Sequence, residues 1–168
     1  MTNFTVVYDA CVLYPAAARD LVVEIARTGL LRAKWTARIH AEWINAAIRA
    51  RPDLNRSRLE RAAELMNKAV PDCLVAGFES LEAGLTSLPD ADDRHVLAAA
   101  IHCGAQEIVT FNLRDFPDAA TMSRYARRAN PSTTCLATYS HACLRIGGFE
   151  KQNRTYRSQL RPLFMPPI

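Results

Sequence analysis

Short runs of β-branched and aromatic residues alternate along this chain with longer segments of helical periodicity, and this alternation constrains the fold most. The runs cover residues 4–8, 30–35, 73–78 and 107–111, and the run at 73–78 is expected to form either a strand or a strand-like approach. Each run has the length of one buried strand, and the segments between them are long enough to hold crossover helices. Because parallel strands require such crossovers, the pattern predicts an α/β sandwich with a small, mainly parallel sheet of four or five strands.

The boundaries of the longer helices are indicated by capping and stop residues. One helix is expected from about residue 16 to residue 28, where Gly29 stops it. Thr36 is a good N-cap for the next helix, which Pro52 ends, and a third helix opens at Asn55 or Ser57. The last of these helices starts at the acidic cluster of residues 90–93 and ends at residues 103–104. A turn over residues 10–15 and a short piece over residues 79–85 complete the expected pattern.

Composition and length fit one soluble domain with its own core. The chain has 168 residues, of which 49% are hydrophobic and 23% are charged, with a net charge of +4. No apolar run approaches the roughly 20 residues of a membrane span. The start of the chain lacks the basic and apolar parts of a signal peptide, so a cytoplasmic protein is expected. Five scattered cysteines without a CxxC pair argue against a zinc ribbon and favour free thiols.

The residues after about 117 show a weaker pattern. Helices are expected over residues 122–128, 135–145 and 153–163. We therefore expect two parts: residues 1–120 form the α/β domain, and residues 121–168 form a helical extension packed on the same domain.

Acidic residues stand at positions where parallel α/β proteins bind their ligands, outside the carboxyl ends of the strands. Asp9 directly follows the first strand, Asn112 and Asp115 follow a later one, and Glu42 lies within a helix. Three more acids, Asp90, Asp92 and Asp93, crowd the start of the last helix of the domain. One helix start needs only one capping acid, and carboxylates that converge on one cleft repel each other without a cation.

Oxygen ligands without a supporting set of histidines or cysteines favour Mg²⁺ or Mn²⁺ over zinc. Such a site suits phosphoryl chemistry, because the cation activates water and neutralises a phosphate.

Three stretches with these acids resemble the PIN domain, and more narrowly the VapC-type ribonuclease toxins of bacterial toxin–antitoxin pairs. The stretches are VYDACVLYP (residues 7–15), DADDRHVLAAA (residues 90–100) and IVTFNLRDFP (residues 108–117), with Glu42 between the first two. The resemblance covers roughly the first two-thirds of the chain with its motifs in order. It implies a three-layer α/β/α sandwich with a small, mainly parallel sheet and an acidic Mg²⁺ or Mn²⁺ site.

The resemblance also implies roles for individual residues. Asp9, Glu42, Asp93 and Asp115 are the expected catalytic acids. The expected metal ligands are Asp9, Asp93, Asp90 and Asp115. Asn112, Thr110 and Asp92 are expected to support them, with Asp92 mainly a helix cap. Two positions depart from the family pattern: Asn112 stands where a fourth acid is common, and Cys11 replaces the Asn or Ser that orients the first acid.

The expected function is a metal-dependent endoribonuclease that cleaves RNA phosphodiesters as the toxin of a toxin–antitoxin pair. Its expected partners are an RNA substrate, a cognate antitoxin protein and a second copy in a homodimer, without a membrane. The alternative is a catalytically weak or inactive PIN module that binds RNA or protein, and Cys11 and Asn112 keep this alternative open. A phosphatase with an aspartyl nucleophile is disfavoured, because it needs a second acid at the position of Cys11.

Overall fold

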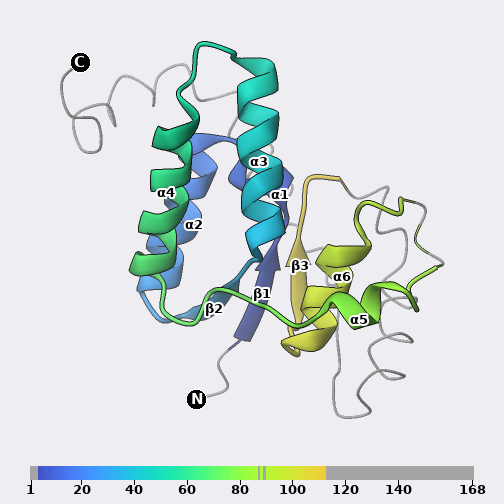
Figure 1. The fold of residues 1–168 in the computed structure, drawn as a ribbon. Helices are drawn as coiled ribbons and strands as arrows, with labels where there is room; N and C mark the ends of the chain where they lie inside the picture. The colour runs from blue at the N-terminus through green and yellow to red at the C-terminus, as the bar shows by residue number, and fades with distance from the viewer. Residues whose placement is uncertain (1–3, 87, 89, 113–168) are drawn as a thin grey trace. The chain divides into compact units, whose positions relative to one another are not determined.

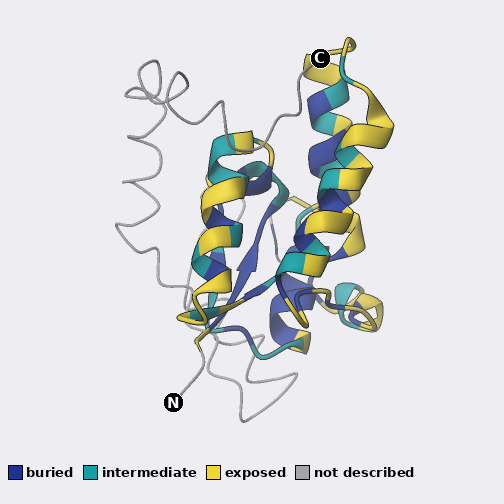
Figure 2. Ribbon diagram, turned by 90° about the vertical axis from the view of Figure 1, so that its left-hand side faces the viewer, coloured by how far each residue is buried: buried dark blue, intermediate teal, exposed yellow. Residues whose placement is uncertain are grey.

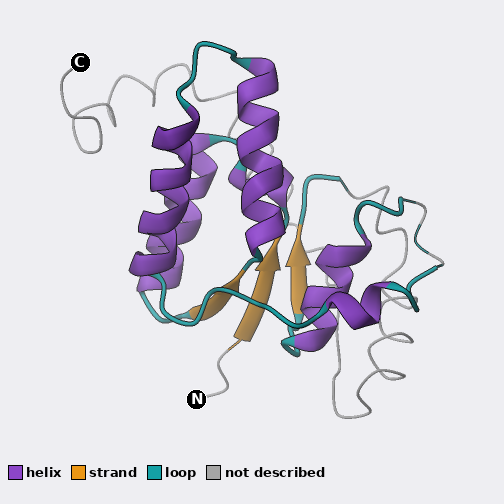
Figure 3. Ribbon diagram, viewed as in Figure 1, coloured by secondary structure: helices purple, strands orange, loops and turns teal. Residues whose placement is uncertain are grey.

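The computed structural model describes residues 4–86, 88 and 90–112. Its sheet has three parallel strands in the order β2-β1-β3: β1 (Phe4–Tyr8), β2 (Leu31–Lys34) and β3 (Glu107–Val109) (Figures 1 and 3). Val6 of the central strand pairs with Ala33 on one side and with Glu107 on the other. Val6 and Val7 are both buried although they point to opposite faces of the sheet, which is typical of a central parallel strand.

In the described part of the chain, four longer helices surround this sheet, and they begin and end close to where capping residues predict. They are α2 (Ala16–Arg27), α3 (Ala37–Ala50), α4 (Arg56–Ala69) and α6 (Arg94–His102). Thr36 accepts a hydrogen bond from the Ile39 amide at the start of α3, and Asn55 accepts one from the Ser57 amide at the start of α4. These helix predictions are confirmed.

The helices form layers on both faces of the sheet. The chain moves from β1 to β2 in one direction and returns across β1 to β3 in the other, so right-handed crossovers place the connecting helices on opposite faces. Accordingly α2 packs on β2, whereas α6 packs on β1 and β3, and the sheet lies between the two helices (Figure 2). The predicted α/β/α sandwich is therefore present.

Two local expectations were wrong in detail, and an alternative left open is decided. Residues 10–13 form a short helix, α1 (Ala10–Leu13), instead of a turn. The run at residues 73–78, expected as a strand or a strand-like approach, takes the second form: Leu74 bridges to Trp35, and Gly77 then turns the chain with a φ of +79° into α5 (Glu79–Glu82). The third strand ends at Val109 instead of residue 111, so the described residues contain three strands where four or five were expected.

A buried polar network joins α3 to α4 inside the core. The Trp35 indole N–H donates to Asn67 Oδ1 at 2.8 Å, and the Trp43 indole N–H donates to His40 Nδ1 at 2.9 Å. His40 Nε2 then lies 3.0 Å from the same Asn67 oxygen. Since Nδ1 accepts, Nε2 carries the proton and donates, which satisfies every indole and imidazole nitrogen of the network.

The other expectations fall on residues 113–168, which lie outside the described residues. They are Asp115, the helices over residues 122–128, 135–145 and 153–163, and the boundary between residues 120 and 121. Within the described residues, no helix combines the length and the apolar content that a bilayer crossing requires.

Candidate active site

Asp9 stands at the carboxyl end of the central strand and is the N-cap residue of α1. Its backbone N–H donates to the Val109 carbonyl at 3.1 Å, which ties the start of α1 to the end of β3. The residue is only 6% exposed. A carboxylate at this depth needs hydrogen bonds and a compensating charge.

Two side chains from different parts of the chain donate to the same oxygen of Asp9. The Thr110 hydroxyl donates to Asp9 Oδ2 at 2.7 Å, and the Cys11 thiol donates to it at 2.9 Å. No described residue forms a hydrogen bond to the other oxygen, Oδ1, or an ion pair with Asp9. The arrangement orients the carboxylate through one oxygen and leaves the second for another ligand.

Cys11 supplies a neutral donor to this pair. Burial, reinforced by the charge of Asp9 and the hydrogen bond to it, raises the pKa of the Cys11 thiol to about 12. The sulfur also accepts a hydrogen bond from the Phe111 amide at 3.2 Å, and the Thr110 hydroxyl accepts one from the Asn112 amide at 3.0 Å. These contacts draw residues 110–112 toward Asp9 and explain why the β3 ladder ends at Val109.

Glu42 lies on α3 and reaches the start of α6. Its Oε1 is 2.9 Å from His95 Nε2, and His95 is two residues after Asp93. The same oxygen accepts a hydrogen bond from Arg38 Nε at 3.3 Å. The contact with His95 therefore brings this predicted catalytic acid to the same helix start as the acidic cluster.

The acids of the cluster differ in their local roles. Asp93, and not Asp92 as predicted, is the N-cap residue of α6, and its side chain makes no capping hydrogen bond. Asp90 Oδ1 instead accepts a hydrogen bond from the Asp92 amide at 2.8 Å and stabilises the turn before the helix. Asp92 is exposed, whereas Asp93 is half-buried. The local hydrogen bond at this helix start is therefore made by Asp90, and the side chain of Asp93 does not cap the helix.

The donor chemistry of Asp9 fits a hard divalent cation. Both of its donors are neutral, and a buried carboxylate with a free oxygen is a typical ligand of Mg²⁺ or Mn²⁺. Among the described residues, however, no three His, Cys, Asp or Glu side chains gather closely enough to hold a metal, so Asp9, Asp90 and Asp93 do not form one cluster. The fit therefore rests on Asp9, and Asp115 lies outside the described residues.

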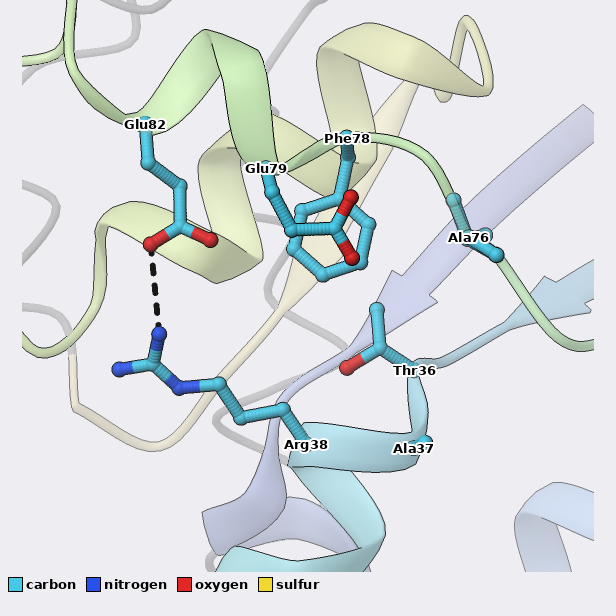
Figure 4. Close-up of a pocket in the computed structure, with 8 residues that line it drawn as sticks. Thr36, Ala37, Arg38, Ala76, Phe78, Glu79 and Glu82 are labelled. Carbon is cyan, nitrogen blue, oxygen red and sulfur yellow. Dashed lines mark hydrogen bonds and ion pairs between the residues drawn. The ribbon is translucent and has the colours of Figure 1, made fainter.

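A pocket of about 340 Å³ lies between the start of α3, the chain at residues 75–79 and α5 (Figure 4). The ion pair between Arg38 Nη1 and Glu82 Oε2, 3.2 Å long, connects the two helices that line it. None of Asp9, Glu42, Asp90 or Asp93 lines this pocket, so we assign it no part in the chemistry.

The fold and the residues at its sheet edge define a class: a three-layer α/β protein with a buried acid at the carboxyl end of its central parallel strand. A family model of the PIN domain matches residues 5–114, which is more than half of the chain. The chain belongs to the PIN-domain family. No curated protein and no solved structure matches it. PIN domains are generally nucleases, and PIN nucleases typically use divalent metals such as Mg²⁺.

The structure adds two residues whose contacts with Glu42 the sequence had not predicted, His95 and Arg38. Cys11 stands where the family resemblance places the residue that orients the first acid, and its thiol donates to Asp9. The signal for His95 was a polar residue two positions after Asp93 and directly before the apolar run of residues 96–101. Arg38 stands one helical turn before Glu42, a spacing at which opposite charges meet.

Proposed function

We propose that this protein is a metal-dependent endoribonuclease that hydrolyses RNA phosphodiesters and acts as the toxin of a toxin–antitoxin pair. The observation that carries the proposal is the state of Asp9: it is buried, oriented by two neutral donors through Oδ2, and free of hydrogen bonds from the described residues at Oδ1. Membership of a family of nucleases supports the reaction class.

In this proposal Asp9, Asp93, Asp90 and Asp115 hold one or two Mg²⁺ or Mn²⁺ ions. When bound, the cation neutralises the phosphate and acidifies water. Thr110 and Cys11 keep the Asp9 carboxylate in one orientation, and the Asn112 amide donates to the Thr110 hydroxyl. Asp92 supports the turn of Asp90 before α6 through its amide. Glu42 orients the attacking water, and Asp93 adds negative charge at the start of α6. Asp115, which follows β3 in the sequence, completes the set of acids.

Recognition of RNA depends on backbone charge and on loop shape in this proposal, because a polyanion is attracted by clusters of Lys and Arg. Three arginines of α4 and its preceding loop contribute little, since each is paired with an acid. Arg51 contacts Asp53 at 2.6 Å, Arg56 contacts Glu60 at 3.8 Å, and Arg61 contacts Glu64 at 2.8 Å. The antitoxin would cover the acidic edge, and a homodimer of the chain is the expected assembly.

The test is cleavage of a structured RNA by the full-length protein. Cleavage should require Mg²⁺ or Mn²⁺, stop with EDTA, and be lost in Asp9→Asn and Asp93→Asn. Asp53→Asn is the matched control, because Asp53 is exposed and pairs only with Arg51 among the described residues. Cleavage that persists with EDTA and in both variants would contradict the metal mechanism. Arrest of growth on expression, relieved by a protein encoded next to the gene, tests the toxin role.

A second candidate is a PIN module that binds RNA or protein without cutting it. It is favoured by the absence of a three-acid cluster in the described part of the chain and by Asn112 at the position of a fourth acid. Binding of RNA without any cleavage, in the presence of saturating Mn²⁺, would support this module over the nuclease.

A further inference from the structure

His95 is a polar side chain in the buried part of α6. Its exposure is 1%, and the six residues that follow it, 96–101, are all buried and apolar. A buried imidazole is costly unless its nitrogens find partners. Neither ring nitrogen makes an aligned hydrogen bond with the described residues.

The polar group nearest to this ring is the carboxylate of Glu42. His95 Nε2 and Glu42 Oε1 are 2.9 Å apart, within hydrogen-bond distance, although the N–H is not aligned on the oxygen. The histidine is fixed by burial, whereas the Glu42 side chain is 35% exposed and can rotate. A small rotation of the Glu42 side chain completes the hydrogen bond. The buried His95 ring therefore determines the position of the Glu42 carboxylate.

Arg38 contacts the same oxygen of Glu42, Oε1, but constrains it less. Its side chain is 43% exposed, and the same guanidinium also contacts Glu82 at 3.2 Å (Figure 4). An exposed ion pair shared between two carboxylates stabilises either one weakly. The buried contact with His95 is the stronger constraint on Glu42.

We infer that His95 is a positioning residue, which holds the carboxylate of Glu42 beside the start of α6 through Nε2. The inference rests on the proposed function, in which Glu42 is a catalytic acid. His95 is too deeply buried to reach a substrate, so it acts only through Glu42. The two histidine nitrogens make the role testable, because only Nε2 faces Glu42.

The experiment compares His95→Gln with His95→Asn in the full-length protein. The amide nitrogen of Gln reproduces the place of Nε2, whereas that of Asn reproduces the place of Nδ1. With a single-stranded RNA oligonucleotide and Mg²⁺, His95→Asn should lower kcat about tenfold to a hundredfold and leave KM within about twofold. His95→Gln should restore most of kcat. His102→Gln, at an exposed position of the same helix, is the control and should match the wild type.

Equal losses in His95→Gln and His95→Asn, or no loss in either, would overturn the inference. Where His95→Asn does not fold, His95→Leu provides the variant without a donor. A second readout does not need activity: the ¹³C resonance of the Glu42 carboxylate, assigned with Glu42→Gln. The Glu42 resonance should keep its chemical shift in His95→Gln. In His95→Asn it should move toward the chemical shift of the exposed Glu64. An unchanged resonance in both variants would overturn the inference.

The two readouts separate the inference from the proposed function. A wild-type protein that never cleaves RNA contradicts the nuclease, and the Glu42 resonance then decides the role of His95. A wild-type protein that cleaves, with both His95 variants equally active, contradicts only the inference.

Discussion

The Thr110 hydroxyl donates a 2.7 Å hydrogen bond to the buried Asp9 carboxylate, although 101 positions separate the two residues in the chain. The contact exists because β1 and β3 are parallel neighbours, with Tyr8 paired with Val109. Strand β1 ends one residue before Asp9, and strand β3 ends one residue before Thr110. Parallel pairing in this register therefore assembles the first element of the site before any ligand binds.

Thr110→Val should weaken the site while preserving the fold. Valine has the shape of threonine without the hydroxyl, and a hydrogen bond to a charged group contributes about 1.5–3 kcal/mol. We expect RNA cleavage to fall by about tenfold to a hundredfold, with Thr110→Ser close to the wild type. Initial rates of cleavage give the measurement. Thr28→Val at an exposed position is the control, and an equal effect of both valines would contradict the role of Thr110.

The donor at position 11 should matter more than its sulfur. Cys11→Ser keeps a hydroxyl donor for Asp9 and should retain cleavage, whereas Cys11→Ala removes the donor and should reduce cleavage by about tenfold.

The thiol of Cys11 should also react slowly in the native protein. Burial and the charge of Asp9 raise the pKa of the thiol to about 12, so almost no thiolate is present near pH 8. Alkylation with iodoacetamide, followed by mass spectrometry of peptides, measures this in native and urea-unfolded samples. Rapid native modification of Cys11 would show that the thiol is neither buried nor held by Asp9.

Mg²⁺ should stabilise the wild-type protein but not Asp9→Asn. A ligand that binds only the native state adds RT ln(1 + [L]/Kd), about 2.7 kcal/mol at 100 times Kd. Asp9→Asn removes a buried charge that lacks an ion-pair partner among the described residues, so its Tm without metal should equal or exceed that of the wild type. Thermal unfolding with MgCl₂ or EDTA gives both results. A similar rise of Tm in Asp9→Asn would place cation binding elsewhere.

Acid should destabilise the fold through His40. Burial is the main reason why the pKa of His40 lies below its ordinary value of 6.5. In addition, His40 Nδ1 already accepts a hydrogen bond from the Trp43 indole. The unfolded chain therefore binds more protons than the folded one just below pH 6.5, and the free energy of unfolding falls as pH decreases through this range.

Urea denaturation at several pH values between about 7.5 and 5.5 measures this dependence on His40. His40→Asn should be less stable at the higher pH and show a flatter pH dependence. His102→Gln serves as the exposed control and should keep the wild-type slope. An unchanged slope in His40→Asn would assign the acid sensitivity to other groups.

The sequence alone determined the elements whose cause is local. The apolar run at residues 4–8, the Thr36 cap and the glycine at residue 104 all act within a few positions, and β1, α3 and the end of α6 follow from them. It also placed Asp9 at the carboxyl end of the central strand, because that position depends only on where the apolar run stops.

Only the tertiary structure decided which side chains meet. Parallel pairing carried Thr110 to Asp9, and the packing of α3 and α6 brought Glu42 to His95, contacts that no local pattern encodes. The same holds for residues 73–78, which have the composition of a strand but form a single bridge to Trp35, since the chain turns at Gly77. Long-range contacts depend on strand register and helix packing, and these are properties of the whole folded chain.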